Sequence, residues 1–215
     1  MGRVFIMGID GAEPSLLYRW AEAGHLPNFA RLLPRAAYGP LTSTIHPLTA
    51  QAWTSMLTGV NPGRHGIFDF SRLIPRSYRM EPYTSAHRRA PGFWQFMPEG
   101  ARAGLMNVPL TYPPEPLPGF MVTGLFTPDI RKGVWPPEIL AELGDDYQPD
   151  VMSHWYDEPD VFLADLFAMH DAHHAAMRRL WERHSPDAAL FVYVAVDRTC
   201  HPYWGAMTPE HLAEP

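Results

Sequence analysis

The sequence has little cysteine, no long apolar run and no cluster of basic residues. Its single cysteine, Cys200, excludes an intrachain disulfide framework and is typical of a reducing compartment, so we expect a cytoplasmic location. No apolar run approaches the roughly 20 residues that a membrane helix needs, so no membrane association is expected. The net charge is −6 and no basic stripe is present, which argues against a nucleic-acid polymer as partner but leaves a nucleotide open as substrate.

Proline, by contrast, is abundant and unevenly placed. Many of the 24 prolines fall within residues 71–155, where each one fixes φ and removes a backbone donor. Long helices are therefore not expected there, and we predict an irregular insertion with short strands, of the kind that often covers an active site. The whole chain, residues 1–215, has the length of a single domain with a substantial core.

Short apolar runs alternate with helical patterns along the chain. The run at residues 4–9 is nearly continuous, which predicts a strand buried on both faces of a parallel sheet rather than a signal peptide. The other expected elements are strands at residues 102–108, 120–123 and 188–196, and helices from Pro14 and at residues 27–33, 49–57 and 160–184. This alternation predicts an α/β fold with a mostly parallel sheet and helices on both faces.

Two of the expected strands end on aspartate, Asp10 and Asp197. Because the carboxyl ends of parallel strands meet at one edge of the sheet, both carboxylates are expected on the rim where ligands bind. They are candidate metal ligands there, or else each one only caps the helix that follows, since Asp is a favoured N-cap residue. His201 follows Asp197 by four residues, a helical spacing that suits one shared ion or an ordinary surface acid–imidazole pair.

Thr49 follows a proline-containing loop and begins a predicted helix. The simplest role of a threonine at this point is that of an N-cap. A helix N-terminus is also where an anion is best stabilised, by free N–H groups and by the helix dipole. A hydroxyl coordinated there to a divalent cation becomes a nucleophile near neutral pH, and the residues alone leave both roles open.

Several short motifs follow one another in a specific order over most of the chain. They are Gly8-Ile9-Asp10-Gly11, Leu26-Pro27-Asn28-Phe29, Pro47-Leu48-Thr49, Ala52-Trp53-Thr54-Ser55, Thr58-Gly59, His65-Gly66-Ile67, and Asp197-Arg198 with His201 and Trp204. Each motif is modest alone, but their ordered combination resembles the type I phosphodiesterase/nucleotide pyrophosphatase family of the alkaline phosphatase superfamily. The resemblance implies an alkaline phosphatase-like fold.

The resemblance also implies a metal-dependent hydrolase of small phosphate esters or nucleotide-like substrates. By this likeness, Thr49 would attack phosphorus in line and form a phosphothreonine intermediate that is then hydrolysed. Two divalent ions are implied, zinc or alternatively manganese. Asp10 and Thr49 would hold one of them, and Asp197 and His201 would hold the other.

Two departures from the family pattern affect what is expected of this chain. The family's later Asp-His pair and the lone His beyond it do not follow, and residues 209–212 look helical close to Pro215, so we expect a C-terminally truncated fragment. Phe70 stands where nucleotide pyrophosphatases carry a phosphate-binding Asn, and Asn107 is either a substitute donor or a turn residue. A phosphomutase with the same intermediate and a noncatalytic fragment are the alternative functions. The sequence gives no indication of oligomeric state.

Overall fold

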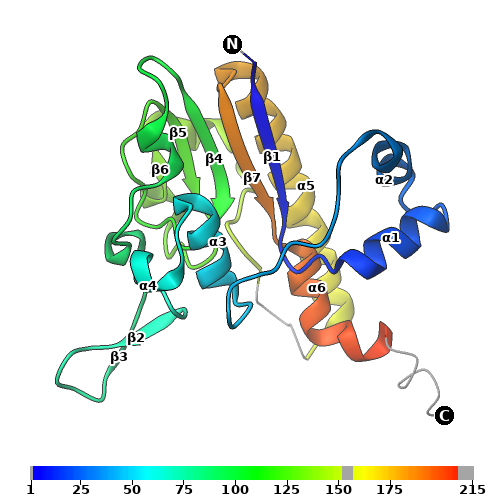
Figure 1. Ribbon diagram of the computed structural model, residues 1–215, viewed down its shortest axis with the longest axis horizontal. Helices are drawn as coiled ribbons and strands as arrows, with labels where there is room; N and C mark the ends of the chain where they lie inside the picture. Colours follow the sequence, from blue (N-terminus) through cyan, green and yellow to red (C-terminus); the bar gives the residue numbers. More distant parts are fainter. Residues whose placement is uncertain (1, 152–156, 208–215) are drawn as a thin grey trace.

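The computed structural model describes residues 2–151 and 157–207, which form a five-stranded sheet with helices on both faces (Figure 1). The strand order is β1-β7-β4-β5-β6. Four strands are parallel, namely β1 (Val4–Ile9), β7 (Ala188–Tyr193), β4 (Ala103–Val108) and β5 (Gly119–Thr123), and β6 (Val134–Trp135) runs antiparallel to β5. The predicted α/β fold with a mostly parallel sheet is confirmed, and the carboxyl ends of the parallel strands meet at one rim.

β1 lies at an edge of this sheet, whereas β4 and β7 lie in its interior. Among the described residues β1 pairs with β7 alone, and Val4, Phe5 and Met7 are 54%, 41% and 54% exposed. Every residue of β4, in contrast, is buried. The expectation that the first strand is buried on both faces is therefore wrong. Its apolar run indicates a strand, but hydropathy carries no information about which position a strand takes in the sheet.

The helices begin and end at the expected signals. α1 and α5 start at Pro14 and Pro159, where the missing N–H of proline costs no helical hydrogen bond, and α3 ends at Gly59 with φ 68°. None of the described helices is both long and apolar enough to cross a membrane. The helices are α1 (Pro14–Glu22), α2 (Pro27–Leu32), α3 (Thr49–Thr58), α4 (Pro62–His65), α5 (Pro159–His184) and α6 (Ala195–Tyr203), with 3-10 turns η1 (Leu33–Arg35), η2 (Ser85–His87), η3 (Phe93–Phe96), η4 (Ile130–Lys132), η5 (Pro137–Glu142) and η6 (Trp204–Met207).

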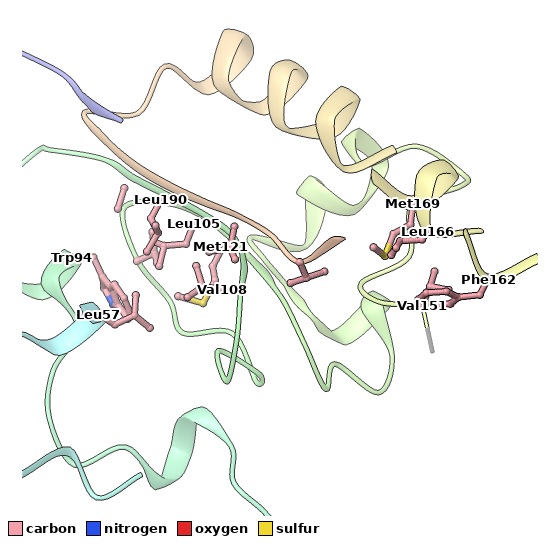
Figure 2. Packing of buried hydrophobic residues seen from close by; sticks show 14 residues of the cluster. Leu57, Trp94, Leu105, Val108, Met121, Val151, Phe162, Leu166, Met169 and Leu190 are labelled. Atoms are coloured by element: carbon pink, nitrogen blue, oxygen red, sulfur yellow. The ribbon is translucent and has the colours of Figure 1, made fainter. Parts of the chain in front are cut away.

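Alternate residues of β4 and β7 enter two hydrophobic clusters, as the two-residue period of a strand requires. One cluster joins the sheet to α3 and η3 and extends to the first half of α5 (Figure 2); it includes Leu57, Trp94, Leu105, Val108, Met121, Phe162, Leu166 and Leu190. The other joins the sheet to the second half of α5 and to η5; it includes Met106, Phe120, Ile139, Met177, Leu180 and Phe191. Packing on both faces fixes the rim from which the candidate residues project.

The proline-rich residues 71–155 consist partly of irregular segments and partly of strands of the main sheet. They contain the antiparallel hairpin of β2 (Ser71–Leu73) and β3 (Met80–Pro82) and four 3-10 turns, and no α-helix is found in the part of this range that the structure describes. They also supply β4 and β5, which pair within the main sheet. The irregular portion is therefore divided by strands that belong to the core.

One predicted boundary differs from the structure near the candidate site. β7 ends at Tyr193 and α6 begins at Ala195, so Asp197 lies in the first turn of a helix and not at the end of a strand. The apolar run continues unbroken across this junction because Val194 is also buried, at 3% exposure, and hydropathy therefore does not separate strand from helix. The helix-like stretch at residues 209–212 lies outside the described residues.

Candidate active site

Asp10 is held at the carboxyl end of β1 by two side chains of α3. Its side chain is buried, its Oδ1 accepts a hydrogen bond from Trp53 Nε1 at 3.0 Å, and its Oδ2 accepts one from Thr49 Oγ1 at 3.4 Å. Asp10 does not cap α1, because that role belongs to Glu13, whose carboxylate accepts from the backbone N–H of Leu16. The capping alternative for Asp10 is therefore excluded.

Thr49 is the first residue of α3, and the N-cap is Leu48, which makes no side-chain capping bond. The hydroxyl of Thr49 points to Asp10 instead of back to its own helix. Thr49 and Trp53 are four residues apart, so the helix places both side chains on the face that meets Asp10. The N-cap alternative for Thr49 is also excluded by this geometry.

Burial sets the electrostatic state of Asp10. Desolvation raises the pKa of its carboxyl above the ordinary value, the Trp53 hydrogen bond lowers it, and the nearby Asp197 carboxylate raises it further. The positive charge of Arg198 and the Thr49 hydroxyl act in the lowering direction. The net result is a buried carboxylate beside a second carboxylate, an arrangement that positive charge stabilises.

Asp197 and His201 lie one turn apart on α6. His201 Nε2 is 3.5 Å from Asp197 Oδ2, and the side chains are 54% and 19% exposed respectively. Asp197 does not cap the helix, because the N-cap is Val194 and makes no side-chain capping bond. The predicted pairing of the two side chains on one helical face is what the structure shows, and His201 is the more accessible partner.

Gly11 brings the two pairs of residues together. It has φ 71°, a left-handed conformation that favours glycine, and a Cβ added there would lie 2.6 Å from Asp197 Cα. Gly8 has a comparable role, since its added Cβ would lie 2.4 Å from the Trp53 ring. These glycines allow β1 to approach α6 and α3 closely enough for one site.

Three residues that support the site are not among the residues predicted for it. Trp53 donates to Asp10, and its spacing of four from Thr49 on a helix is the signal that could have identified it. Arg198 donates to Asp197 Oδ2 at 3.1 Å and is adjacent to it in sequence. Asp150, which pairs with Arg198, lies 48 residues earlier, and no sequence pattern connects the two.

Other polar residues considered from the sequence serve the interior. Asn107 has φ 59° at the end of β4, and its amide pairs with His173 Nδ1 at 2.9 Å and with the Tyr147 hydroxyl, so it is committed to a buried network. His65 accepts from the Ile67 N–H at 3.1 Å through Nδ1 and meets Ser55 Oγ through Nε2, while burial lowers its pKa. These contacts are structural.

The four side chains expected to hold two metal ions form two separate pairs. Within residues 2–151 and 157–207, no three His, Cys, Asp or Glu side chains gather closely enough to hold a metal ion. Asp10 with Thr49 and Asp197 with His201 offer oxygen and imidazole donors of the types that Zn²⁺ and Mn²⁺ accept. Each pair therefore fits as part of a ligand shell.

A groove of about 1050 Å³ lies beside the helix that carries Thr49. It is lined by residues 41–45, by the side of α3 from Gln51 to Met56, and by residues 59–63. Leu41 and Ile45 are 94% and 90% exposed at its border. The groove offers apolar surface next to the turn of α3 on which Thr49 and Trp53 are found.

Comparisons with known proteins place the chain in a family. The solved structure of phosphonoacetate hydrolase from Sinorhizobium meliloti 1021, in complex with phosphonoacetate, superimposes with a TM-score of 0.61 at 20% identity. The match covers 92% of this chain and 47% of that one, so the chain spans about half the length of this structural relative. No sequence among the curated proteins compared with the chain matches it significantly. The family model for type I phosphodiesterase / nucleotide pyrophosphatase matches residues 4–214, and the chain therefore belongs to this family, within the alkaline phosphatase superfamily.

Proposed function

We propose that the protein hydrolyses phosphate esters with Thr49 as the nucleophile. The observation that carries the proposal is the hydrogen bond from Thr49 Oγ1 to Asp10 Oδ2 at the N-terminus of α3. A hydroxyl that capped its own helix would point to the helix backbone, whereas this one is oriented by a carboxylate of a different segment. Family membership supports phosphoester hydrolysis as the reaction class.

The residues of the chain have separate roles in this proposal. Thr49 Oγ1 gives its proton to solvent and forms a bond to phosphorus as the bond from phosphorus to the leaving oxygen breaks. The leaving oxygen takes up a proton from solvent, and water later hydrolyses the phosphothreonine. Asp10 orients the hydroxyl, and Trp53 fixes the Asp10 carboxylate. The first N–H groups of α3 have no acceptor within the helix and are suited to a phosphoryl oxygen.

Two divalent cations, zinc or manganese, are part of the proposal. Asp10 and Thr49 would hold one ion, and Asp197 and His201 would hold the other. When bound, such ions supply positive charge that offsets the charge of the phosphoryl oxygens. The raised pKa of Asp10 supports this assignment, because a buried carboxylate next to Asp197 gains most from a neighbouring cation.

The proposed substrates are small phosphate esters, with nucleotide-like molecules included. The structural relative is described as a hydrolase of phosphonoacetate, a small phosphonate, which supports a small substrate here. Phe70 packs edge to face against Phe126, with the two ring centroids 5.1 Å apart. Its side chain has no hydrogen-bond donor for a phosphate oxygen, which argues against nucleotide selectivity. A cytoplasmic location is part of the proposal and rests on the single cysteine.

Substitution of Thr49 tests the proposal. With bis(p-nitrophenyl) phosphate and Mn²⁺ or Zn²⁺, Thr49→Ala should lose turnover by about three orders of magnitude or more, while Thr49→Ser should retain part of it. Thr58→Ala is the matched control, because the Thr58 hydroxyl donates to Thr54 O at the other end of the same helix. Equal activity of wild type and Thr49→Ala would refute the assigned nucleophile.

A noncatalytic binding role is the second candidate function. It is favoured by the absence, among the described residues, of any group of three metal-ligating side chains. Calorimetric titration with Mn²⁺ and Zn²⁺ separates the two candidates. Binding of two ions per chain would support the enzyme, and a chain that binds neither ion and hydrolyses no ester would support the noncatalytic role.

A further inference from the structure

An ion pair between the buried Arg198 and the partly buried Asp150 lies next to Asp197. Arg198 is 5% exposed and donates from Nε to Asp150 Oδ1 at 2.8 Å and from Nη2 to Asp150 Oδ2 at 2.6 Å. This two-pronged geometry uses the planar fork of the guanidinium, which a lysine does not provide. The pair ties α6 to the segment that precedes α5.

The remaining terminal nitrogen of the same guanidinium reaches the candidate site. Arg198 Nη1 donates to Asp197 Oδ2 at 3.1 Å, the oxygen that also lies 3.5 Å from His201 Nε2. Asp150, Arg198 and Asp197 therefore form a continuous chain of charge-assisted hydrogen bonds. Because Asp150 holds two nitrogens of the rigid fork, the direction of the third is fixed as well.

Burial and contacts exclude a direct role of Arg198 toward substrate. Nε, Nη1 and Nη2 each already donate to a carboxylate oxygen, and the side chain is nearly inaccessible. Any effect of Arg198 on the reaction is therefore exerted through Asp197.

We propose that Asp150 and Arg198 are positioning residues that hold the Asp197 carboxylate in one orientation, with Oδ2 bound to Arg198 and Oδ1 left for a ligand of the site. The role of this carboxylate in metal binding rests on the proposed function, whereas its orientation by Arg198 does not. Partners that orient a metal-ligating side chain typically contribute 10–100-fold to affinity or activity, which is roughly the size of effect expected here.

Two conservative variants and one control test the proposal in the full chain. Arg198→Lys keeps the charge but loses the fork, and Asp150→Asn keeps the shape but loses the charge. Arg88→Lys is the control, since the Arg88 side chain is only 6% exposed, pairs with Glu115 and lies over the Trp94 ring, with Cζ 5.0 Å from the ring centroid. The variants and the control all disturb an ion pair whose arginine side chain is only 6% exposed, so a general loss of stability is common to the three.

The first measurement is the Hα–Hβ coupling of Asp197 by NMR in the metal-free protein. One dominant rotamer is expected in wild type and in Arg88→Lys, and averaged couplings are expected in Arg198→Lys and Asp150→Asn. If one of these two fails to fold, the other decides the result. Unchanged Asp197 couplings would overturn the proposal, whatever the activity of the protein.

The second measurement is Mn²⁺ affinity by calorimetry. We expect a loss of about 10–100-fold in Arg198→Lys and Asp150→Asn and a change of less than about twofold in Arg88→Lys. Equal affinities in all four proteins would overturn the positioning role and leave the proposed function standing. Absence of Mn²⁺ binding in wild type would instead count against the proposed function, and the NMR couplings alone would then decide the positioning role.

Discussion

The two halves of the candidate site are built in different ways. The half around Asp10 joins β1 to α3, and Thr49 and Trp53 engage both oxygens of its carboxylate. The half around Asp197 is a pair of side chains one helical turn apart, and His201 is 54% exposed on its side chain. The proposed nucleophile is therefore oriented by tertiary packing, whereas the second pair depends on local helix geometry and on the contact of Asp197 with Arg198.

Gly11→Ala is expected to have the largest effect, because Gly11 is where the two halves meet. The new Cβ would clash with Asp197 Cα at 2.6 Å in addition to the strain of φ 71°. We expect the free energy of unfolding, measured with urea, to fall by about 3 kcal/mol. Gly24→Ala is the matched control: its φ is 84° with nothing within 4 Å of the added Cβ, and its loss should be only about 1 kcal/mol. Equal losses would show that the close approach does not matter.

Trp53→Phe tests the half of the site around Asp10, whose carboxylate accepts hydrogen bonds from two side chains. Phenylalanine keeps a ring beside Gly8 but loses the N–H that binds Asp10 Oδ1, so we expect about 1 kcal/mol lower stability and roughly tenfold slower ester hydrolysis. Trp135→Phe is the control, because Trp135 Nε1 donates to Leu117 O at 3.1 Å, away from the site. It should lose similar stability and keep full activity. Loss of activity in the control alone would contradict the role given to Trp53.

Asp10→Asn tests how much the burial of a charged carboxylate at Asp10 destabilises the metal-free protein. Its effect on the free energy of unfolding should be smaller than that of Trp53→Phe. The folded-state pKa of Asp10 is raised by burial, so its contribution to metal-free stability is present below the ordinary pKa and is lost as pH rises through the folded value. Asparagine does not ionise. In the presence of a chelator, the variant should therefore gain stability relative to wild type as pH rises from about 4, the ordinary pKa of Asp, through the folded-state pKa of Asp10. A constant difference across this range would contradict the burial argument.

His201→Ala should change stability least. The His201 side chain is 54% exposed, and contacts of such surface side chains contribute little, so the free energy of unfolding should stay within about 0.5 kcal/mol of wild type. Mn²⁺ affinity should nevertheless fall by at least about tenfold if His201 is a ligand. His25→Ala, which replaces an exposed histidine just after α1, provides the control for both measurements. Unchanged Mn²⁺ affinity in His201→Ala would remove His201 from the site.

Most of the sheet was predictable from the sequence, because apolar runs with a turn signal at their end are a local property. The edge position of β1 was not, since it depends on which strands pair and not on the composition of β1. The break between β7 and α6 was also missed, because Val194 stays buried across it and the apolar pattern does not change.

In the candidate site, too, contacts between residues close in sequence were predictable, whereas contacts that only the tertiary fold creates were not. The pairing of Asp197 with His201 follows from helical spacing and was predicted. The contact of Asp10 with Thr49 was expected only from the family resemblance, because 39 residues separate them. Asp150 was not predicted, because 48 residues separate it from Arg198 and no helix or strand periodicity connects two residues so far apart.

The most direct test of the account is to trap the covalent intermediate on Thr49. Protein mixed with a phosphate ester and Mn²⁺ or Zn²⁺ is quenched in acid during turnover, digested and mapped by mass spectrometry. We expect a phosphorylated peptide that carries phosphothreonine at position 49. The same peptide from Thr49→Ser should contain no phosphothreonine at that position. Product release with phosphate on a different residue, or with no phosphorylated peptide at quench times within one turnover, would contradict the account.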